Sequence, residues 1–433
     1  MYDLKPKAVF AHERVFDHPL AIERMERMLD ALGMSVEDVP VVTLDDVDEI
    51  IAAAGIGDEA APEHIIAGGH GRLRQGVYKV AHDPVLVFNT FVWDESKRQE
   101  VPRQYRNPHA RRLARQFAGV GRDFAFSRRD IRRQRPDSVC QGGWGIHSVS
   151  GCVHKCDYCG QGFLVDLMLD LEDFCDVLTQ MFDQRPEQKL YRYDLYSDIL
   201  AFEPEYGCSE VVGRCFDQTD DKYLLLYTRS DNVAHLLDLP CKTHSLINWT
   251  ISMDTVCRVI ERDSPSLDER IEAMRTCQDA GYVVRAGFTP IIPIREWRAE
   301  TTDMLERLFG RVEPEVVRCW VLAMMDADEF ELMFDAESMD PRFMRRMRED
   351  ADELRGQHIA PFPLDVRAEI YEHYLDEVRR ISPDTPVALC TDHPKLWEML
   401  APKLQMRPGK MFCCCGALSV PGGWEAVRAA NQT

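Results

Sequence analysis

Three cysteines in one short segment, Cys152, Cys156 and Cys159, are the residues of this sequence best suited by type and spacing to chemistry. Their C-x3-C-x2-C spacing places three thiolates on one loop, where they can bind the irons of an iron–sulfur cluster. A cubic cluster has one iron per corner, so three thiolates leave one iron without a protein ligand. That iron can hold a small molecule that chelates through an amine and a carboxylate. The motif therefore predicts a cluster with an open iron.

This spacing resembles that of the radical SAM superfamily, in which a [4Fe-4S] cluster binds S-adenosylmethionine (SAM). A structural zinc site is the alternative, but it usually needs closed ligands in two pairs. His154 or His147 would have to supply the missing ligand, and no second pair with zinc-finger spacing follows. We therefore expect a [4Fe-4S] cluster and SAM as cofactors.

The elements that would position this loop alternate between strand and helix from residue 144 onward. The patterns predict strands over 144–150, 190–196, 223–228, 246–253, 283–292 and 316–324, and helices over 171–182, 232–239 and 267–280. Such repeats indicate a parallel sheet with helices outside, and ligands on these sheets lie at the carboxyl ends of the strands. The cluster loop follows a strand and should lie at that end.

We expect an α/β fold in three parts. Residues 1–140 read as an N-terminal α/β region, which includes a helix from Pro19 to Leu32 that stops at Gly33. Residues 141–330 form the core with the cluster loop. Residues 331–433 form a C-terminal extension with a cysteine-rich segment.

Several separate stretches are similar, in the same order, to the spore photoproduct lyase branch of the radical SAM enzymes. Among them are Ser197-Asp-Ile199, Ile251-Ser-Met-Asp254 and the segment from Pro290 to Trp297. The resemblance covers roughly residues 5 to 310. It implies a partial (β/α)6 barrel that holds one [4Fe-4S] cluster and SAM.

Residue by residue, the resemblance implies that Cys152, Cys156 and Cys159 bind the cluster. It also implies that SAM is contacted by Ser197, Arg229, Ser252 and Asp254. Two of these depart from the family pattern, because Arg229 replaces a lysine and Asp254 replaces an asparagine. Tyr158 precedes the third cysteine, where radical SAM enzymes often place an aromatic residue against SAM.

One departure from the family concerns the residue that donates a hydrogen atom back to the product. The lyases carry a cysteine just ahead of the Ser-Asp-Ile stretch that returns a hydrogen atom to the repaired thymine, whereas this chain has Leu195 and Tyr196 there. We therefore expect the radical chemistry of the family with a different substrate.

A second cysteine group, Cys413, Cys414 and Cys415, lies near the C-terminus. These residues could ligate an auxiliary iron–sulfur cluster, bind a thiophilic element such as arsenic, or provide a hydrogen-atom donor. Neighbouring side chains on a strand point to opposite faces, so three ligands to one metal would require a turn. A structural, buried run of small side chains is the remaining alternative.

The charge of the chain bears on its substrate. Against 52 Lys and Arg stand 73 Asp and Glu, a formal net charge of −21, which argues against nucleic acid as a partner. An acidic chain suits a cationic small molecule better. Glu203 and Tyr206, near the expected barrel mouth, are candidates for binding an amino sugar and handling protons.

We therefore expect a radical SAM enzyme that forms a 5′-deoxyadenosyl radical and removes a hydrogen atom from a small polyhydroxylated or cationic metabolite. Dehydration of an aminoglycoside in antibiotic biosynthesis is one such lyase reaction. The alternatives are a DNA photoproduct-type repair lyase and 3-amino-3-carboxypropyl transfer to an element such as arsenic. A flavodoxin- or ferredoxin-type protein would donate the electron. The sequence lacks a signal peptide and any run of about 20 apolar residues, so we expect a cytoplasmic protein with no membrane partner.

Overall fold

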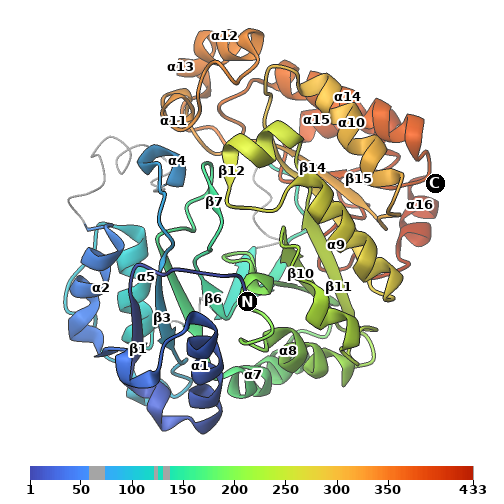
Figure 1. Cartoon of the computed structure of the whole chain (residues 1–433). Helices are drawn as coiled ribbons and strands as arrows, with labels where there is room; N and C mark the ends of the chain where they lie inside the picture. Colours follow the sequence, from blue (N-terminus) through green and yellow to red (C-terminus); the bar gives the residue numbers. More distant parts are fainter. Residues whose placement is uncertain (58–73, 121–124, 130–136, 433) are drawn as a thin grey trace.

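The computed structural model describes residues 1–57, 74–120, 125–129 and 137–432. Two sheets organise these residues, with helices on their outer faces (Figure 1). The main sheet has the strand order β15-β14-β13-β11-β10-β9-β5-β4, and all neighbours are parallel except β4 with β5. Its strands are β4 (Phe126–Arg129), β5 (Gly143–Ile146), β9 (Leu190–Tyr193), β10 (Tyr223–Thr228), β11 (Ser245–Thr250), β13 (Val283–Ile291), β14 (Val317–Val321) and β15 (Val387–Leu389).

From β5 to β15 the order across the main sheet follows the order along the chain, as expected of repeated βα units. The sheet curls as a partial barrel, which confirms the predicted fold class. Helices pack on its outside: α7 (Leu171–Gln184), α8 (Cys208–Asp217), α9 (Leu267–Asp279), α10 (Trp297–Phe309), α14 (Leu364–Ile381) and α15 (Pro394–Leu404). The carboxyl ends of its parallel strands share one edge, where ligands bind in such folds.

The second sheet has the order β2-β1-β3-β8-β6 and carries the N-terminal helices. Its strands are β1 (Val9–His12), β2 (Val41–Val42), β3 (Val85–Asn89), β6 (Val149–Ser150) and β8 (Leu164–Met168), and its helices are α1 (Pro19–Leu32), α2 (Val47–Ala54) and α5 (Pro108–Phe117). A separate two-stranded ladder joins β7 (Lys155–Cys156) to β12 (Glu261–Arg262). The remaining α-helices of the described residues are α4 (Gln75–Tyr78), α11 (Ala327–Met333), α12 (Pro341–Glu349), α13 (Ala351–Leu354) and α16 (Trp424–Gln432).

Both sheets take strands from across the expected boundaries at residues 140 and 330. Strands β6 and β8 belong to the expected core but complete the N-terminal sheet, while β15 comes from the C-terminal extension and joins the main sheet. One continuous buried hydrophobic cluster includes side chains from all three expected parts. The three parts therefore fold together as one body.

Local signals explain where several helices begin and end. Ser266 and Glu269 form the expected capping box at the start of α9, with the Ser266 N–H donating to the Glu269 carboxylate at 2.7 Å. Helix α1 ends at Gly33, which has a φ of 69°. The expected strand over 144–150 is interrupted instead, because the backbone N–H groups of Ser148 and Val149 donate to Asp194 at 3.1 and 3.2 Å. The chain therefore leaves one sheet at β5 and enters the other at β6.

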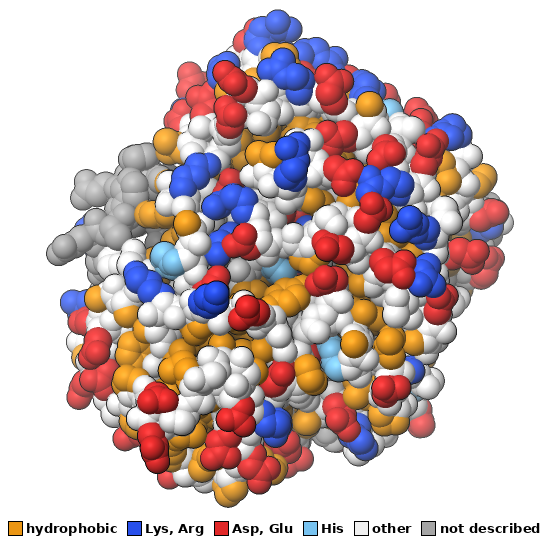
Figure 2. Space-filling model, in the orientation of Figure 1, with side chains coloured by type: hydrophobic (Ala, Val, Ile, Leu, Met, Phe, Trp, Pro, Cys, Tyr) orange, Lys and Arg blue, Asp and Glu red, His pale blue; other side chains and the backbone are white. Residues whose placement is uncertain are grey.

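Among the residues that the structure describes, every helix is too short or too polar to cross a lipid bilayer. On the face drawn in Figure 2, acidic and basic side chains are intermixed.

Candidate cofactor site at the carboxyl edge of the barrel

The cluster loop, Gly151–Gly160, follows β6 and is fixed by its own backbone. The Cys152 N–H donates to the Gln161 carbonyl at 2.6 Å, and the Cys159 N–H donates to the Cys156 carbonyl at 2.9 Å. Ladder β7–β12 pairs Cys156 with Glu261. Gly151 has a φ of +112°, and a Cβ there would lie 1.9 Å from the Leu164 carbonyl oxygen, so only glycine fits where the loop begins.

Residues 74–76 of the N-terminal region donate hydrogen bonds to this loop. The Gln75 N–H donates to the Cys159 carbonyl at 2.9 Å, and the Gly76 N–H donates to the Asp157 carbonyl at 2.8 Å. Gly76 permits this approach, since a Cβ would lie 2.7 Å from the Asp157 Cβ. The Arg74 guanidinium donates to the Tyr158 carbonyl at 2.7 Å and pairs with Glu329 at 2.6 Å. The loop is thus held by residues 74–76, and Glu329 fixes Arg74 in turn.

The three thiols face one cavity of about 140 Å³ at the carboxyl edge of the main sheet. Ser197 follows β9, Arg229 follows β10, and Thr250 ends β11, so neighbouring strands supply the opposite wall. The full lining comprises Cys152, His154, Cys156, Cys159, Gln161, Asp194, Leu195, Tyr196, Ser197, Asp198, Tyr227, Thr228, Arg229 and Thr250. The structure therefore brings the cysteine motif together with two of the expected SAM contacts, Ser197 and Arg229.

Arg229 connects the cluster loop to the barrel. Its Nη1 donates to the Cys156 Sγ at 2.8 Å and to the Tyr158 hydroxyl at 2.9 Å, and it lies 3.2 Å from the Glu261 carboxylate. Glu261 is fully buried and also pairs with Arg270 at 2.7 Å. The hydroxyls of Tyr158 and Ser252 donate to the same Glu261 oxygen at 2.5 and 3.0 Å. Tyr158 and Ser252 therefore support the site through Glu261 and are absent from the cavity lining.

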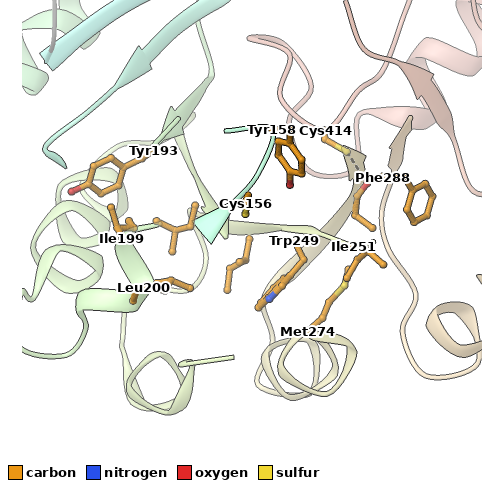
Figure 3. Close-up of a cluster of buried hydrophobic side chains, with 14 of the residues drawn as sticks. Cys156, Tyr158, Tyr193, Ile199, Leu200, Trp249, Ile251, Met274, Phe288 and Cys414 are labelled. Carbon is orange, nitrogen blue, oxygen red and sulfur yellow. Dashed lines mark hydrogen bonds between the residues drawn. The ribbon is translucent and has the colours of Figure 1, made fainter. Parts of the chain in front are cut away.

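Burial dominates the protonation of Cys152 and Cys156. It raises the pKa of the Cys156 thiol to about 12, although the Arg229 cation opposes this, and it raises the pKa of Cys152 well above its ordinary value. Burial would also raise the pKa of the Glu261 carboxyl, but Arg270, Arg229 and the Tyr158 hydroxyl together lower it to about 2. Figure 3 shows Cys156 and Tyr158 within the buried cluster that surrounds this site.

Asp198 fixes the wall that contains Ser197. It accepts hydrogen bonds from the Thr228 hydroxyl at 2.8 Å and the Arg229 N–H at 2.9 Å, and its second partner side chain is His154, 3.0 Å away. The Ser197 hydroxyl is buried and has no hydrogen-bond partner within the described residues. It is therefore available to a ligand in the cavity.

Three expected site residues lie elsewhere. Asp254 pairs with Arg307 of α10 near the surface, because that cation faces it across the turn after β11. Glu203 is buried at the start of α8, where it accepts from the N–H groups of Gly207 and Ser209 at 3.1 and 2.8 Å. The Tyr206 hydroxyl is buried and donates to the Met168 carbonyl at 2.8 Å. Glu203 and Tyr206 thus stabilise the interior rather than line the barrel mouth, where we had expected them.

The Cys413–Cys415 run packs against the concave face of the main sheet. The Cys414 thiol donates to the carbonyls of Ala286 and Val316 at 3.4 and 3.6 Å. The Cys415 thiol lies 3.5 Å from the Arg318 guanidinium. Within the described ranges, no three His, Cys, Asp or Glu side chains are already gathered as a metal site. An auxiliary cluster at this run remains a prediction.

Sequence reasoning missed Glu261, Thr250 and Tyr227. Glu261 is one of many carboxylates in the sequence, and only the pairing of β12 with β7 brings it to the cluster loop. Tyr227 and Thr250 lie near the carboxyl ends of β10 and β11, and this position was the available signal. The strand over 223–228 was predicted to the residue, whereas β11 ends at Thr250 and not at residue 253 as expected.

Residues 137–326 match the family described as spore photoproduct lyase. A spore photoproduct lyase of Clostridium acetobutylicum is 22% identical over 188 residues, which cover 41% of this chain and 55% of that protein. The Bacillus subtilis spore photoproduct lyase is 24% identical over 180 residues, 40% of this chain and 53% of that protein. The chain thus matches about half the length of these curated relatives.

Solved structures share the fold over a longer range. Spore photoproduct lyase complexed with dinucleoside spore photoproduct has a TM-score of 0.58 at 14% identity, covering 89% of this chain and 98% of that one. A mutant lyase with bound AdoMet and the same dinucleoside has a TM-score of 0.56 at 15% identity, with the same coverage. The chain is thus similar to spore photoproduct lyases in sequence over the segment that contains the cysteine motif, and it shares their fold over most of its length.

Proposed function

We propose that this chain is a radical SAM enzyme that cleaves SAM reductively and removes a hydrogen atom from a bound substrate. The observation that carries the proposal is the shared cavity. The three thiols of the cysteine motif form one wall, and side chains from the carboxyl ends of β9, β10 and β11 form the other.

The residues present fit a [4Fe-4S] cluster. Burial keeps the thiols of Cys152 and Cys156 protonated when they are free, whereas iron binding would hold them as thiolates. The Arg229 guanidinium donates to the Cys156 sulfur at 2.8 Å, and such hydrogen bonds tune the reduction potential of a cluster. Cys152, Cys156 and Cys159 would therefore hold the cluster.

When bound, the cluster and SAM would supply a 5′-deoxyadenosyl radical, and the protein would supply orientation. The Arg229 cation and the unpartnered Ser197 hydroxyl both face the cavity and would hold the polar groups of SAM. Tyr158 and Ser252 would act by fixing Glu261, which in turn fixes Arg229. An external flavodoxin- or ferredoxin-type protein would donate the electron.

The substrate class is open between two candidates. A small polyhydroxylated metabolite is supported by Leu195 and Tyr196, which stand in the cavity wall in place of the hydrogen-donor cysteine of the lyases. A photoproduct-type DNA lesion is supported by the lyase relatives. The relatives give no support to a place in antibiotic biosynthesis.

Product analysis tests the proposed activity. The protein is reconstituted anaerobically with iron and sulfide, reduced with dithionite and incubated with SAM. We expect 5′-deoxyadenosine from the wild type and none from Cys156→Ala. Cys241→Ala, which alters a buried thiol outside the cavity, is the matched control and should behave as the wild type.

The other products identify the alternatives. Methylthioadenosine would show 3-amino-3-carboxypropyl transfer and overturn the proposal. Absence of both products from protein that contains the cluster would show a non-catalytic iron–sulfur protein. Dinucleoside spore photoproduct and a panel of amino sugars then separate the substrate classes, because only a true substrate should increase the rate of SAM cleavage.

A further inference from the structure

The concave face of the main sheet carries polar side chains directly below the cavity. Tyr227 of β10 pairs in register with Asn248 of β11, and Asn248 pairs with Arg285 of β13. Arg192 of β9 lies one pleat earlier, opposite Leu225, and Leu225 shares a buried cluster with Cys415. Because alternate residues of a strand face the same side, these side chains line the interior of the barrel.

Positive charge is in excess on this face. Arg285 pairs with Glu315 at 2.6 Å, but no carboxylate within the described ranges pairs with Arg192 or Arg318, which are 2% and 7% exposed. A hydrogen bond with the Cys413 side chain lowers the pKa of the Cys415 thiol. The positive charges of Arg318 and Arg192 lower this pKa further, whereas burial raises it. A Cys415 thiolate would balance one of the two arginines. At least one buried cation remains without a counter-charge.

Several hydrogen-bonding groups here also lack partners. Asn248 is fully buried, and neither atom of its amide has a hydrogen-bond partner among the described residues. The Arg318 Nε is likewise buried without one. Buried polar groups are normally paired, because an unpaired group loses its bonds to water and gains none in return. A ligand that accepts and donates at this place would satisfy them.

Arg318 reaches Tyr227, which lines the cavity, because its neighbour is a glycine. Gly287 pairs with Arg318 in register, and a Cβ on Gly287 would lie 3.0 Å from the Arg318 Nη2. The guanidinium lies across this gap and donates to the Tyr227 hydroxyl at 3.0 Å. Tyr227 itself lines the cavity, as does Thr250, which pairs with Gly287. The unpaired groups therefore lie immediately behind the cavity floor.

We infer that Arg318, Asn248 and Tyr227 form a subsite for an oxyanion carried by the substrate, either a phosphoryl or a carboxylate group. The inference rests on the proposed function for the position of the substrate, between this subsite and the cysteine motif. A guanidinium, an amide and a hydroxyl from three strands can bond several oxygens of one oxyanion. The substrate class would then be an anionic small molecule or a nucleotide fragment.

Anion binding to the full-length protein tests this subsite without the cofactors. Isothermal titration with inorganic phosphate and, separately, with acetate gives the dissociation constants for the wild type and for Arg318→Gln. We expect the variant to bind the preferred anion on the order of tenfold or more weakly, as the loss of a charge-assisted hydrogen bond implies. Tighter phosphate binding identifies a phosphoryl group, and tighter acetate binding identifies a carboxylate.

Asn248→Leu provides a second variant in case Arg318→Gln does not fold. Its amide has no partner to lose, so the variant should fold at least as stably as the wild type and still bind the anion several-fold more weakly. Arg342→Gln, which removes an exposed arginine paired with Glu369, is the matched control and should bind like the wild type. Equal anion binding by the wild type and both subsite variants would overturn the inference. SAM cleavage to 5′-deoxyadenosine would be unaffected by that result, so the proposed function would stand.

Discussion

Replacing Glu261 with Gln should destabilise the protein more than any single surface substitution, because this buried carboxylate forms ion pairs with both Arg270 and Arg229. It is fully buried and lies 2.7 Å from Arg270 and 3.2 Å from Arg229. The amide of glutamine keeps a hydrogen-bond acceptor for Tyr158 and Ser252 but removes the charge. Both arginines would then be buried cations without their counter-charge.

Two arguments give the same magnitude. Breaking a buried ion pair costs about 3–5 kcal/mol. The pKa of the Glu261 carboxyl lies at about 2 instead of 4.5, a shift that corresponds to about 3 kcal/mol of stability at neutral pH. Since the folded-state pKa lies below the unfolded value, this contribution is fully present above about pH 4.5 and is lost as the pH falls towards 2.

Urea denaturation of the apoprotein measures this effect. Glu261→Gln should lower the unfolding midpoint at pH 7, and the difference from the wild type should shrink as the pH is lowered below about 4.5. Glu272→Gln, which breaks an exposed pair with Arg275, is the control and should change stability by less than about 0.5 kcal/mol. An unchanged midpoint for Glu261→Gln, or a difference from the wild type that is the same at every pH, would refute the reasoning.

Three further outcomes follow from the site. Arg229→Lys should weaken SAM binding to the cluster-loaded protein about tenfold, because a lysine cannot reproduce the hydrogen bonds of the planar guanidinium to Cys156 and Tyr158. Equilibrium dialysis measures the affinity, and an unaltered affinity would contradict this prediction. Glu203→Gln should lower the free energy of unfolding by about 1–2 kcal/mol, because it weakens the hydrogen bonds at the start of α8. KM should be unchanged in steady-state assays, and a raised KM in stable protein would show that Glu203 binds the substrate. Replacing Cys413, Cys414 and Cys415 together with alanine should leave the iron content at about four per chain, since the Cys414 thiol is hydrogen-bonded to backbone carbonyls. A wild-type iron content of about eight that falls in the variant would show an auxiliary cluster.

The strands and the cluster motif could be predicted from sequence because both signals are local. The run Tyr223–Thr228 was predicted to the residue, and α9 was located by its capping box. Ser197 and Arg229 were assigned through the resemblance to the lyases, and both line the cavity because parallel strands bring their carboxyl ends to one edge.

The errors arose where three-dimensional contacts decide the role of a side chain. Glu203 accepts hydrogen bonds at the start of α8, whereas Glu261 pairs with Arg229. The position of Glu261 depends on the ladder between β7 and β12, which has no local pattern. The net charge of −21 was also a poor guide to the site, because surface carboxylates dominate it while the arginines of the barrel interior are buried.

The exchange of strands between the two sheets limits how this protein can be dissected. The segment that the lyases share, residues 137–326, contributes β6 and β8 to a sheet whose other strands lie upstream of it. The Cys413–Cys415 run, which lies downstream of this segment, covers its barrel interior, and Arg74 and Gln75 donate hydrogen bonds to its cluster loop. An excised fragment would expose the edges of β5, β8 and β14 and the interior of the barrel, so truncation should yield aggregates, and iron loading would require the rest of the chain to be in place.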